Sequence, residues 1–104
     1  MARQKTRRPT TPGEVLSEEF LKPANLTQTA FADHLGCDVK TINRLVNGHT
    51  SIDAKMARRL GSALGTTADF WINLQKAVDL HEAQQDEPEL PPRLPQFDER
   101  AALG

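Results

Sequence analysis

Cysteine, aromatic residues and long apolar runs are all scarce in this chain of 104 residues. A single cysteine, Cys37, excludes a disulfide within the chain, and it has no cluster of histidines beside it to form a metal site. Four Phe, one Trp and no Tyr, with Val and Ile scattered rather than alternating with polar residues, favour helices over strands. No apolar run approaches the roughly 18 residues that cross a membrane. We therefore expect an all-α, cytoplasmic protein with no membrane partner.

Acidic side chains are missing from residues 1–10, where the charged residues are Arg3, Lys5, Arg7 and Arg8. The segment is polar and shows no periodicity, so we interpret it as a flexible basic arm. It either has no role or contacts the phosphates or minor groove of DNA. The overall charge of −1 does not exclude nucleic acid as a partner, because the local field decides what a surface attracts.

Residues 86–104 have the opposite character, because five acidic residues stand against two basic ones, a net charge of −3. Pro88, Pro91, Pro92 and Pro95 forbid a regular helix there and favour extended backbone. Three apolar residues lie among the prolines: Leu90, Leu94 and Phe97. An acidic, proline-rich tail of this kind is either a disordered end or a segment that folds on binding a partner.

Between the two ends, residues 11–85 are predicted to form one domain of five helices with short loops. The first helix begins at Thr11 and Pro12, a hydroxyl cap followed by proline at the first helical position, and it should stop at Pro23. The later N-caps are expected at Thr27, Asp38, Ser51 or Asp53, and Thr66 or Thr67, and the later ends at Gly36, Gly48 and Gly65.

The stretch 27–48 contains two short helices joined by a tight turn. The first buries Phe31 and Leu35, and the second buries Ile42 and Leu45. The second helix turns its apolar side inward and presents cationic and amide groups outward. Such a helix suits the major groove of DNA.

Nine residues of this unit are candidate DNA contacts. Lys40 and Arg44 lie four apart on one helix face, and a basic side chain directed at guanine is the commonest specific contact. Asn43 suits adenine, Val39 suits a thymine methyl, and Thr41 suits a base or a phosphate. Phosphate-binding or positioning roles are expected for Gln28, Asn47, His49 and Thr50. Outside this unit, each of them would be an ordinary surface residue.

The fifth predicted helix carries an apolar stripe that is large for an outer helix of so small a domain. Its members are Phe70, Trp71, Leu74, Ala77 and Val78, and the predicted dimer contacts among them are Phe70, Trp71, Leu74 and Val78. We predict that this stripe packs against a second copy of the chain and forms a homodimer. The alternative is that all of these side chains are buried within one chain.

We find no set of residues in this sequence that is assembled for catalysis. The glutamates of the first helix suit a solvated helix start, and Cys37 suits a small apolar position in the turn rather than a reactive thiol. His34, His49 and His81 show no metal-ligand spacing. We therefore predict no enzyme activity, no cofactor, no metal and no small-molecule substrate.

At the level of motifs, residues 28–48 resemble the helix-turn-helix of the lambda-repressor-like, or Xre/Cro, family. Gln28, Ala32 and Gly36 stand at the family's Q-x-x-x-A-x-x-x-G spacing, and Cys37 takes the apolar place in the turn. Since helix-turn-helix proteins of this kind are numerous, this part of the resemblance implies DNA binding alone.

The flanking segments are more specific and resemble HigA antitoxins. They are PGEVL at 12–16, ALGT at 63–66 and FWINLQ at 70–75. The resemblance implies a dimeric antitoxin that binds a HigB-type toxin, which is an mRNA-cleaving enzyme, and represses their shared operon at a palindromic operator. The alternative is a free-standing, phage-type repressor with no toxin partner. The basic arm and the proline-rich tail fall outside the shared pattern.

Overall fold

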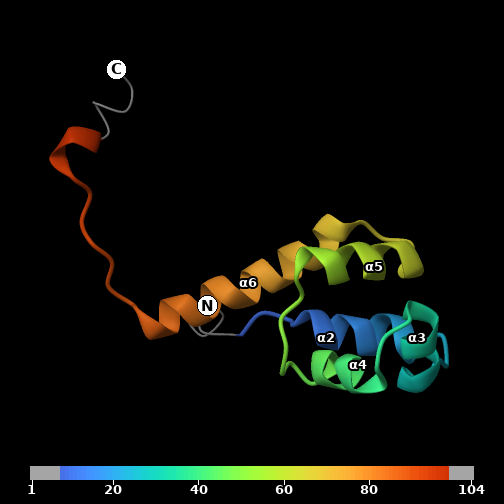
Figure 1. Cartoon of the computed structure of the whole chain (residues 1–104). Helices are drawn as coiled ribbons and strands as arrows, with labels where there is room; N and C mark the ends of the chain where they lie inside the picture. Colours follow the sequence, from blue (N-terminus) through green and yellow to red (C-terminus); the bar gives the residue numbers. More distant parts are fainter. Residues whose placement is uncertain (1–7, 99–104) are drawn as a thin grey trace.

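Helices joined by short turns account for most of the computed structural model, which describes residues 8–98 (Figure 1). In order they are α2 (Pro12–Val15), the π-helical turn η1 (Leu16–Leu21), α3 (Gln28–Leu35), α4 (Val39–Val46), α5 (Ala54–Leu64), α6 (Ala68–Asp86) and the 3₁₀ turn η2 (Pro95–Phe97). The described residues contain no strand, and α2 with η1 corresponds to the first predicted helix. The prediction of an all-α domain of five helices is therefore confirmed. Most of the predicted basic arm, residues 1–7, lies outside the described residues.

Side-chain caps begin the helices at the predicted places. The Thr11 hydroxyl accepts a hydrogen bond from the Glu14 amide at 3.0 Å, and the Glu14 carboxylate accepts one from the Thr11 amide at 2.8 Å. This reciprocal pair is a capping box. The N-caps of α3, α4, α5 and α6 are Thr27, Asp38, Asp53 and Thr67. The structure thus selects Asp53 over Ser51 and Thr67 over Thr66.

The first helix departs from the prediction of one regular helix ending at Pro23. Its second half widens into the π-helical turn η1, in which the Lys22 amide donates to the Ser17 carbonyl, five residues earlier, at 3.0 Å. A π-helical turn places residues five apart above one another, and Leu16 and Leu21 are both buried. The demand for two buried leucines at this spacing explains the wider turn.

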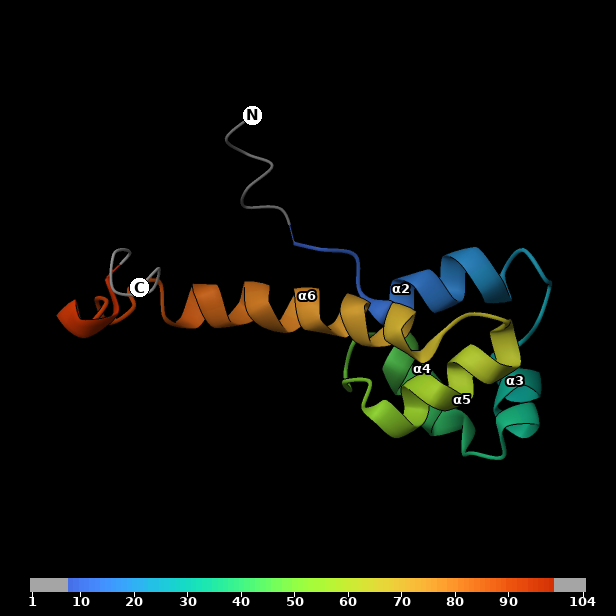
Figure 2. The same ribbon diagram turned by 90° about the horizontal axis from the view of Figure 1, so that it is seen from above.

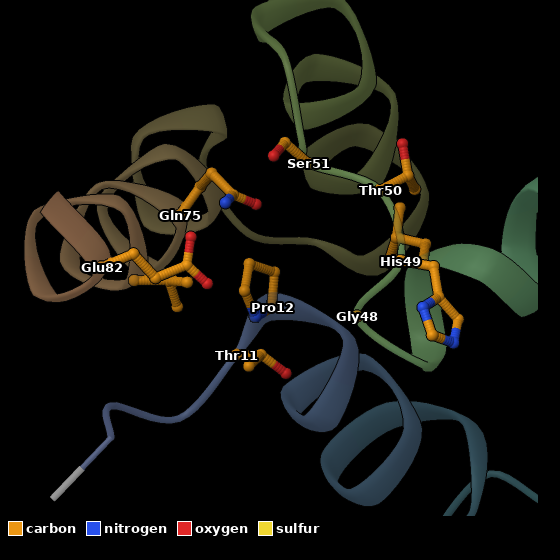
Figure 3. Close-up of a pocket in the computed structure, with 10 residues that line it drawn as sticks. Thr11, Pro12, Gly48, His49, Thr50, Ser51, Gln75 and Glu82 are labelled. Carbon is orange, nitrogen blue, oxygen red and sulfur yellow. The ribbon is translucent and has the colours of Figure 1, made fainter. Parts of the chain in front are cut away.

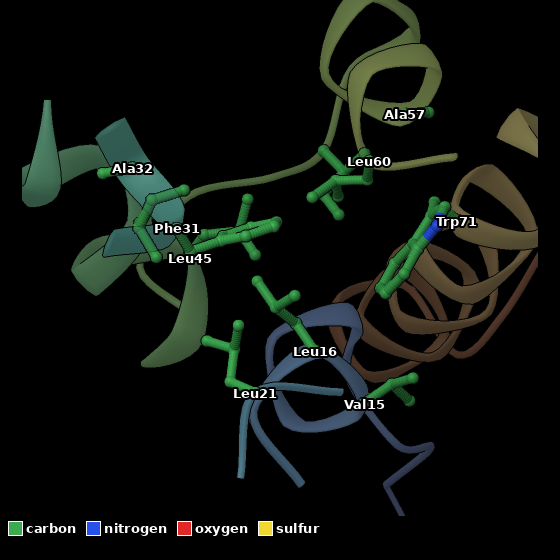
Figure 4. Packing of buried hydrophobic residues seen from close by; sticks show 11 residues of the cluster. Val15, Leu16, Leu21, Phe31, Ala32, Leu45, Ala57, Leu60 and Trp71 are labelled. Carbon is green, nitrogen blue, oxygen red and sulfur yellow. The ribbon is translucent and has the colours of Figure 1, made fainter. Parts of the chain in front are cut away.

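The core lies where the helices meet, and its largest side chain belongs to α6 (Figure 4). Trp71 is 0 % exposed, and its indole N–H donates to the Thr66 hydroxyl at 2.7 Å. Its ring lies 5.7 Å from the ring of Phe20 and 5.1 Å, edge to face, from that of Phe70. These contacts fasten the start of α6 to the domain.

A glycine explains how closely α2 approaches α4. A Cβ on Gly13 would lie 2.0 Å from the carbonyl oxygen of Leu45 and 2.7 Å from that of Val46. No other residue fits there without moving one of the two helices. The glycine of the PGEVL segment thus sets the position of the end of α4.

The second half of α6 extends beyond the packed helices, and the tail leads further away (Figures 1 and 2). Residues 87–94 are irregular, as the prolines predict, before the short turn η2. Four apolar side chains in this part of the molecule are more than half exposed: Leu80, Leu90, Leu94 and Phe97. None of the helices in the described range has both the length and the apolar character needed to cross a membrane.

Candidate nucleic-acid interface

α3, the turn at residues 36–38 and α4 form a helix-turn-helix. Gly36 ends α3 in the left-handed conformation, with φ of 74°, where a Cβ would be strained. Cys37 is half-buried and packs against the core, as its place in the turn predicts. On α4, Ile42 and Leu45 are 0 % and 2 % exposed, so the opposite side of this helix faces solvent.

The predicted DNA contacts lie largely on that solvent side. Seven of the nine are exposed: Val39, Lys40, Asn43, Arg44, Asn47, His49 and Thr50. Gln28 and Thr41 are half-buried. α4 contains no acidic residue from Val39 to Val46, so its exposed side combines cationic and amide groups. Their contact with DNA stays a prediction.

Three amide side chains form a chain across the two helices. The Asn43 side-chain N–H donates to the Gln28 side-chain oxygen at 3.2 Å, and the Asn47 side-chain N–H donates to the Asn43 oxygen at 3.3 Å. These bonds connect the first residue of α3 with the end of α4. Each amide keeps donors or acceptors for a further partner. The bonds orient Asn43 before any ligand arrives, and orientation in advance lowers the entropy cost of binding.

Arg44 holds the loop that follows α4. Its guanidinium donates to the His49 carbonyl at 3.0 Å, and the His49 amide donates to the Arg44 carbonyl at 2.8 Å. A guanidinium has five N–H donors, so this bond leaves others for a base or a phosphate. The sequence predicted base contact for Arg44, and the structure adds a positioning role for it.

Gln75 of α6, which was not among the predicted site residues, fixes the far end of the same loop. Its side chain is 9 % exposed, its oxygen accepts from the Ile52 amide at 2.9 Å, and its N–H donates to the Asp79 carboxylate at 3.0 Å. Arg44 and Gln75 thus hold the loop from both ends. A buried glutamine within an apolar helix face is a weak sequence signal, because glutamine is also common on exposed helix surfaces.

A hollow of about 370 Å³ lies behind this loop, between the start of α2 and the middle of α6 (Figure 3). Its polar lining includes His49, Ser51 and Glu82. Figure 3 shows the ring of His49 directed away from Glu82, so the three do not form a hydrogen-bonded catalytic set. Among residues 8–98, no group of three His, Cys, Asp or Glu side chains could hold a metal ion.

The predicted dimer stripe requires a correction. Trp71 is 0 % exposed and Val78 is 7 % exposed, and Leu74 is partly buried against the core. These three side chains hold α6 to its own domain, so Trp71 and Val78 offer no surface to a second chain. Phe70, at 38 % exposed, keeps part of its surface. The prediction overestimated how many apolar residues of α6 remain outside the core. A buried tryptophan is large and is in contact on every side, so its neighbours on α6 are drawn into the core with it.

Comparison with known proteins agrees with this geometry. A family model described as helix-turn-helix (HTH_3) matches residues 18–71. Antitoxin HigA-1 of Vibrio cholerae is 44 % identical over 78 residues, which are 75 % of this chain and 73 % of that protein. YbaQ of Escherichia coli, an uncharacterised HTH-type transcriptional regulator, is 40 % identical over 84 residues, 81 % of this chain and 74 % of that protein. The structure of Pseudomonas aeruginosa antitoxin HigA with the higBA promoter matches with a TM-score of 0.76 and 39 % identity, covering 84 % of this chain and 100 % of that one.

Proposed function

We propose that this chain, which belongs to the helix-turn-helix (HTH_3) family and within it to the HigA antitoxins, is the antitoxin and autorepressor of a toxin–antitoxin operon. As a dimer it binds a palindromic operator in that operon, and it neutralises a HigB-type toxin by direct contact. The proposed binding to operator DNA implies that this activity is cytoplasmic. The single observation that carries the proposal is the exposed side of α4, on which cationic and amide groups are held in place by bonds to α3 and to the following loop.

For DNA recognition, α4 enters the major groove with its first turns towards the bases. Lys40 is suited to guanine O6 and N7, and Asn43 to adenine N6 and N7. Gln28, at the start of α3, and Thr50, in the loop after α4, approach phosphates on either side. This arrangement is supported by the P. aeruginosa relative, whose structure contains promoter DNA.

Dimerisation then uses the side of α6 that the core leaves exposed. Phe70, Asn73, Ala77 and Leu80 follow one another at intervals of three, four and three residues, the spacing of a helix that packs along a second helix. Leu80 is 62 % exposed and belongs to the second half of α6, the half that extends beyond the packed helices (Figure 1). A two-fold axis beside this stripe would present two copies of α4 to successive major grooves.

Toxin neutralisation is supported by the relatives, because the V. cholerae protein is named an antitoxin. We expect a strain carrying the neighbouring toxin gene to grow when this chain is co-produced and to stop growing without it. The two proteins should also elute as one complex in size-exclusion chromatography. As a control, Lys40→Ala should lose repression and keep neutralisation, since α4 is assigned to DNA.

The free-standing repressor remains the second candidate, and it is supported by the similarity to the E. coli protein, which is named a transcriptional regulator. Growth arrest that persists despite co-production, together with separate elution of the two proteins, would contradict the antitoxin function. If the chain still bound its operator specifically in that case, the free-standing repressor function would be supported.

A further inference from the structure

A basic groove of about 580 Å³ lies between the end of α3 and the outer side of α5. Its lining includes His34 and Leu35 from α3 and Lys55, Arg58 and Arg59 from α5. The groove has no carboxylate among its lining residues. Concave surfaces lined by charges of one sign concentrate the field that they produce, so this groove attracts anions.

The cations of the groove have two different roles. Arg59 is half-buried, and its guanidinium donates to the Leu35 carbonyl at the end of α3, so it is held in place. Lys55 and Arg58 are exposed, and no acidic group is bonded to either in the part of the chain described. The fixed arginine forms the floor, and the two exposed cations are available to a ligand.

Three acidic residues lie close to the groove along the chain: Asp33, Asp38 and Asp53. Asp33, beside His34 on α3, is exposed and is not among the lining residues. Asp38 accepts a hydrogen bond from the Lys40 amide at 3.0 Å, and Asp53 accepts one from the Met56 amide at 2.8 Å. Both carboxylates therefore face the start of their own helix. The caps therefore direct the carboxylates of Asp38 and Asp53 to helix starts, and the groove lining itself contains only basic charges.

The groove adjoins the helix-turn-helix without sharing any residue with the exposed side of α4. Leu35, in its lining, is followed by the turn 36–38 and then by Val39, the first residue of α4. Figures 1 and 2 both show α3 and the second half of α5 at the same end of the domain. In proteins of this class the first residues of the recognition helix meet the bases, while the preceding helix crosses the DNA backbone.

We propose that this groove binds the phosphodiester backbone beside the half-site that α4 reads, with Lys55 and Arg58 contacting phosphates. The inference rests on the proposed operator binding and extends its footprint beyond the helix-turn-helix. Contacts of this kind add affinity at any sequence, and they position α4 without reading bases. An acidic protein segment would also suit the charge, but the position next to the start of α4 favours DNA.

The test is the salt dependence of operator binding by a Lys55→Gln/Arg58→Gln double variant between 50 and 200 mM salt. Each phosphate contact contributes about −0.9 to the slope of log Kobs against log salt, so losing two should make the slope shallower by about 1.8 per protomer. The order of preference among single-base operator variants should not change. A Lys76→Gln/Arg93→Gln variant, which removes two exposed cations from α6 and the tail, should keep the original slope. An Arg58→Lys variant should keep most of the original slope, since the positive charge remains.

Two results would overturn the inference and leave the proposed function intact. One is a slope for the groove variant equal to that of the control variant, with both proteins folded by circular dichroism. The other is an unchanged slope for the groove variant, combined with its failure to bind a peptide of residues 86–98 that the unaltered chain binds. This pair of results would assign the groove to an acidic protein segment. Failure of the unaltered chain to bind any operator would instead contradict the proposed function itself.

Discussion

At the scale of single residues, a few polar side chains position the surface that we propose to bind DNA. Gln75 connects the loop at Ile52 to α6, and Arg44 connects the same loop to α4. Asn43 lies between Gln28 and Asn47 in a chain of amides. Of these, Gln75 is the buried one, and a buried polar group that loses its partner costs more than an exposed one.

Replacing Gln75 with alanine should therefore destabilise the fold. The change leaves the buried Ile52 amide without its acceptor, so we expect the free energy of unfolding to fall by about 1–3 kcal/mol. Urea denaturation followed by circular dichroism measures this. Gln85→Ala, on the exposed end of the same helix, should stay within about 0.5 kcal/mol of the unaltered chain. Equal stability of the two variants would show that the Gln75 bond contributes nothing.

At the scale of elements, α6 has a buried side that packs on the core and an exposed side to which we assign the dimer contact. Trp71 and Val78 hold it to the core, and the stripe through Phe70, Ala77 and Leu80 remains for a second copy. A Trp71→Ala variant would thus report on folding rather than on association. A substitution on the exposed side can change dimerisation without changing the stability of the fold.

For that reason Leu80→Glu should convert the dimer to a monomer and leave the helical content unchanged. It places a charge at the centre of the proposed contact, where desolvation and like-charge repulsion across the two-fold axis oppose association. Sedimentation velocity should show the smaller species at concentrations where Gln85→Glu, which adds the same charge to another side of α6, is still dimeric. A Leu80→Glu protein that remains a dimer would place the interface elsewhere.

The sequence predicted most elements because their signals are local. Thr11, Thr27 and Asp38 act as caps within three residues of the amides that they bind, so their roles are visible in the sequence. The π-helical turn was missed because it follows from packing Leu16 and Leu21 on one core. Long-range contacts were missed because they also depend on how distant parts of the chain pack together.

Arg59 and Gln75 illustrate this limit at the candidate site. Arg59 bonds to a carbonyl 24 residues earlier, and Gln75 bonds to an amide 23 residues earlier. Neither pairing leaves a pattern in the sequence around it. The exposed side of α4, by contrast, could be predicted because Ile42 and Leu45 define the buried side of one short helix.

At the scale of the whole molecule, the loop between α4 and α5 contacts both the proposed DNA-reading helix, through Arg44, and the proposed dimer helix, through Gln75 of α6. The chain measures 55 × 31 × 22 Å along its principal axes, and the second half of α6 and the tail account for its elongation (Figure 1). A pair of such molecules joined along α6 would place the two copies of α4 at a fixed separation. We propose that this separation matches one turn of DNA.

Hydroxyl-radical footprinting on the DNA upstream of the chain's own gene tests that claim most directly. The unaltered protein should protect two tracts whose centres lie about 34 Å, or one helical turn, apart, in two halves of a palindrome. Lys40→Ala should weaken both tracts equally, by about 1–3 kcal/mol in binding free energy, while Lys76→Ala should leave them unchanged. A single protected tract, or two tracts that Lys40→Ala leaves intact, would contradict the account.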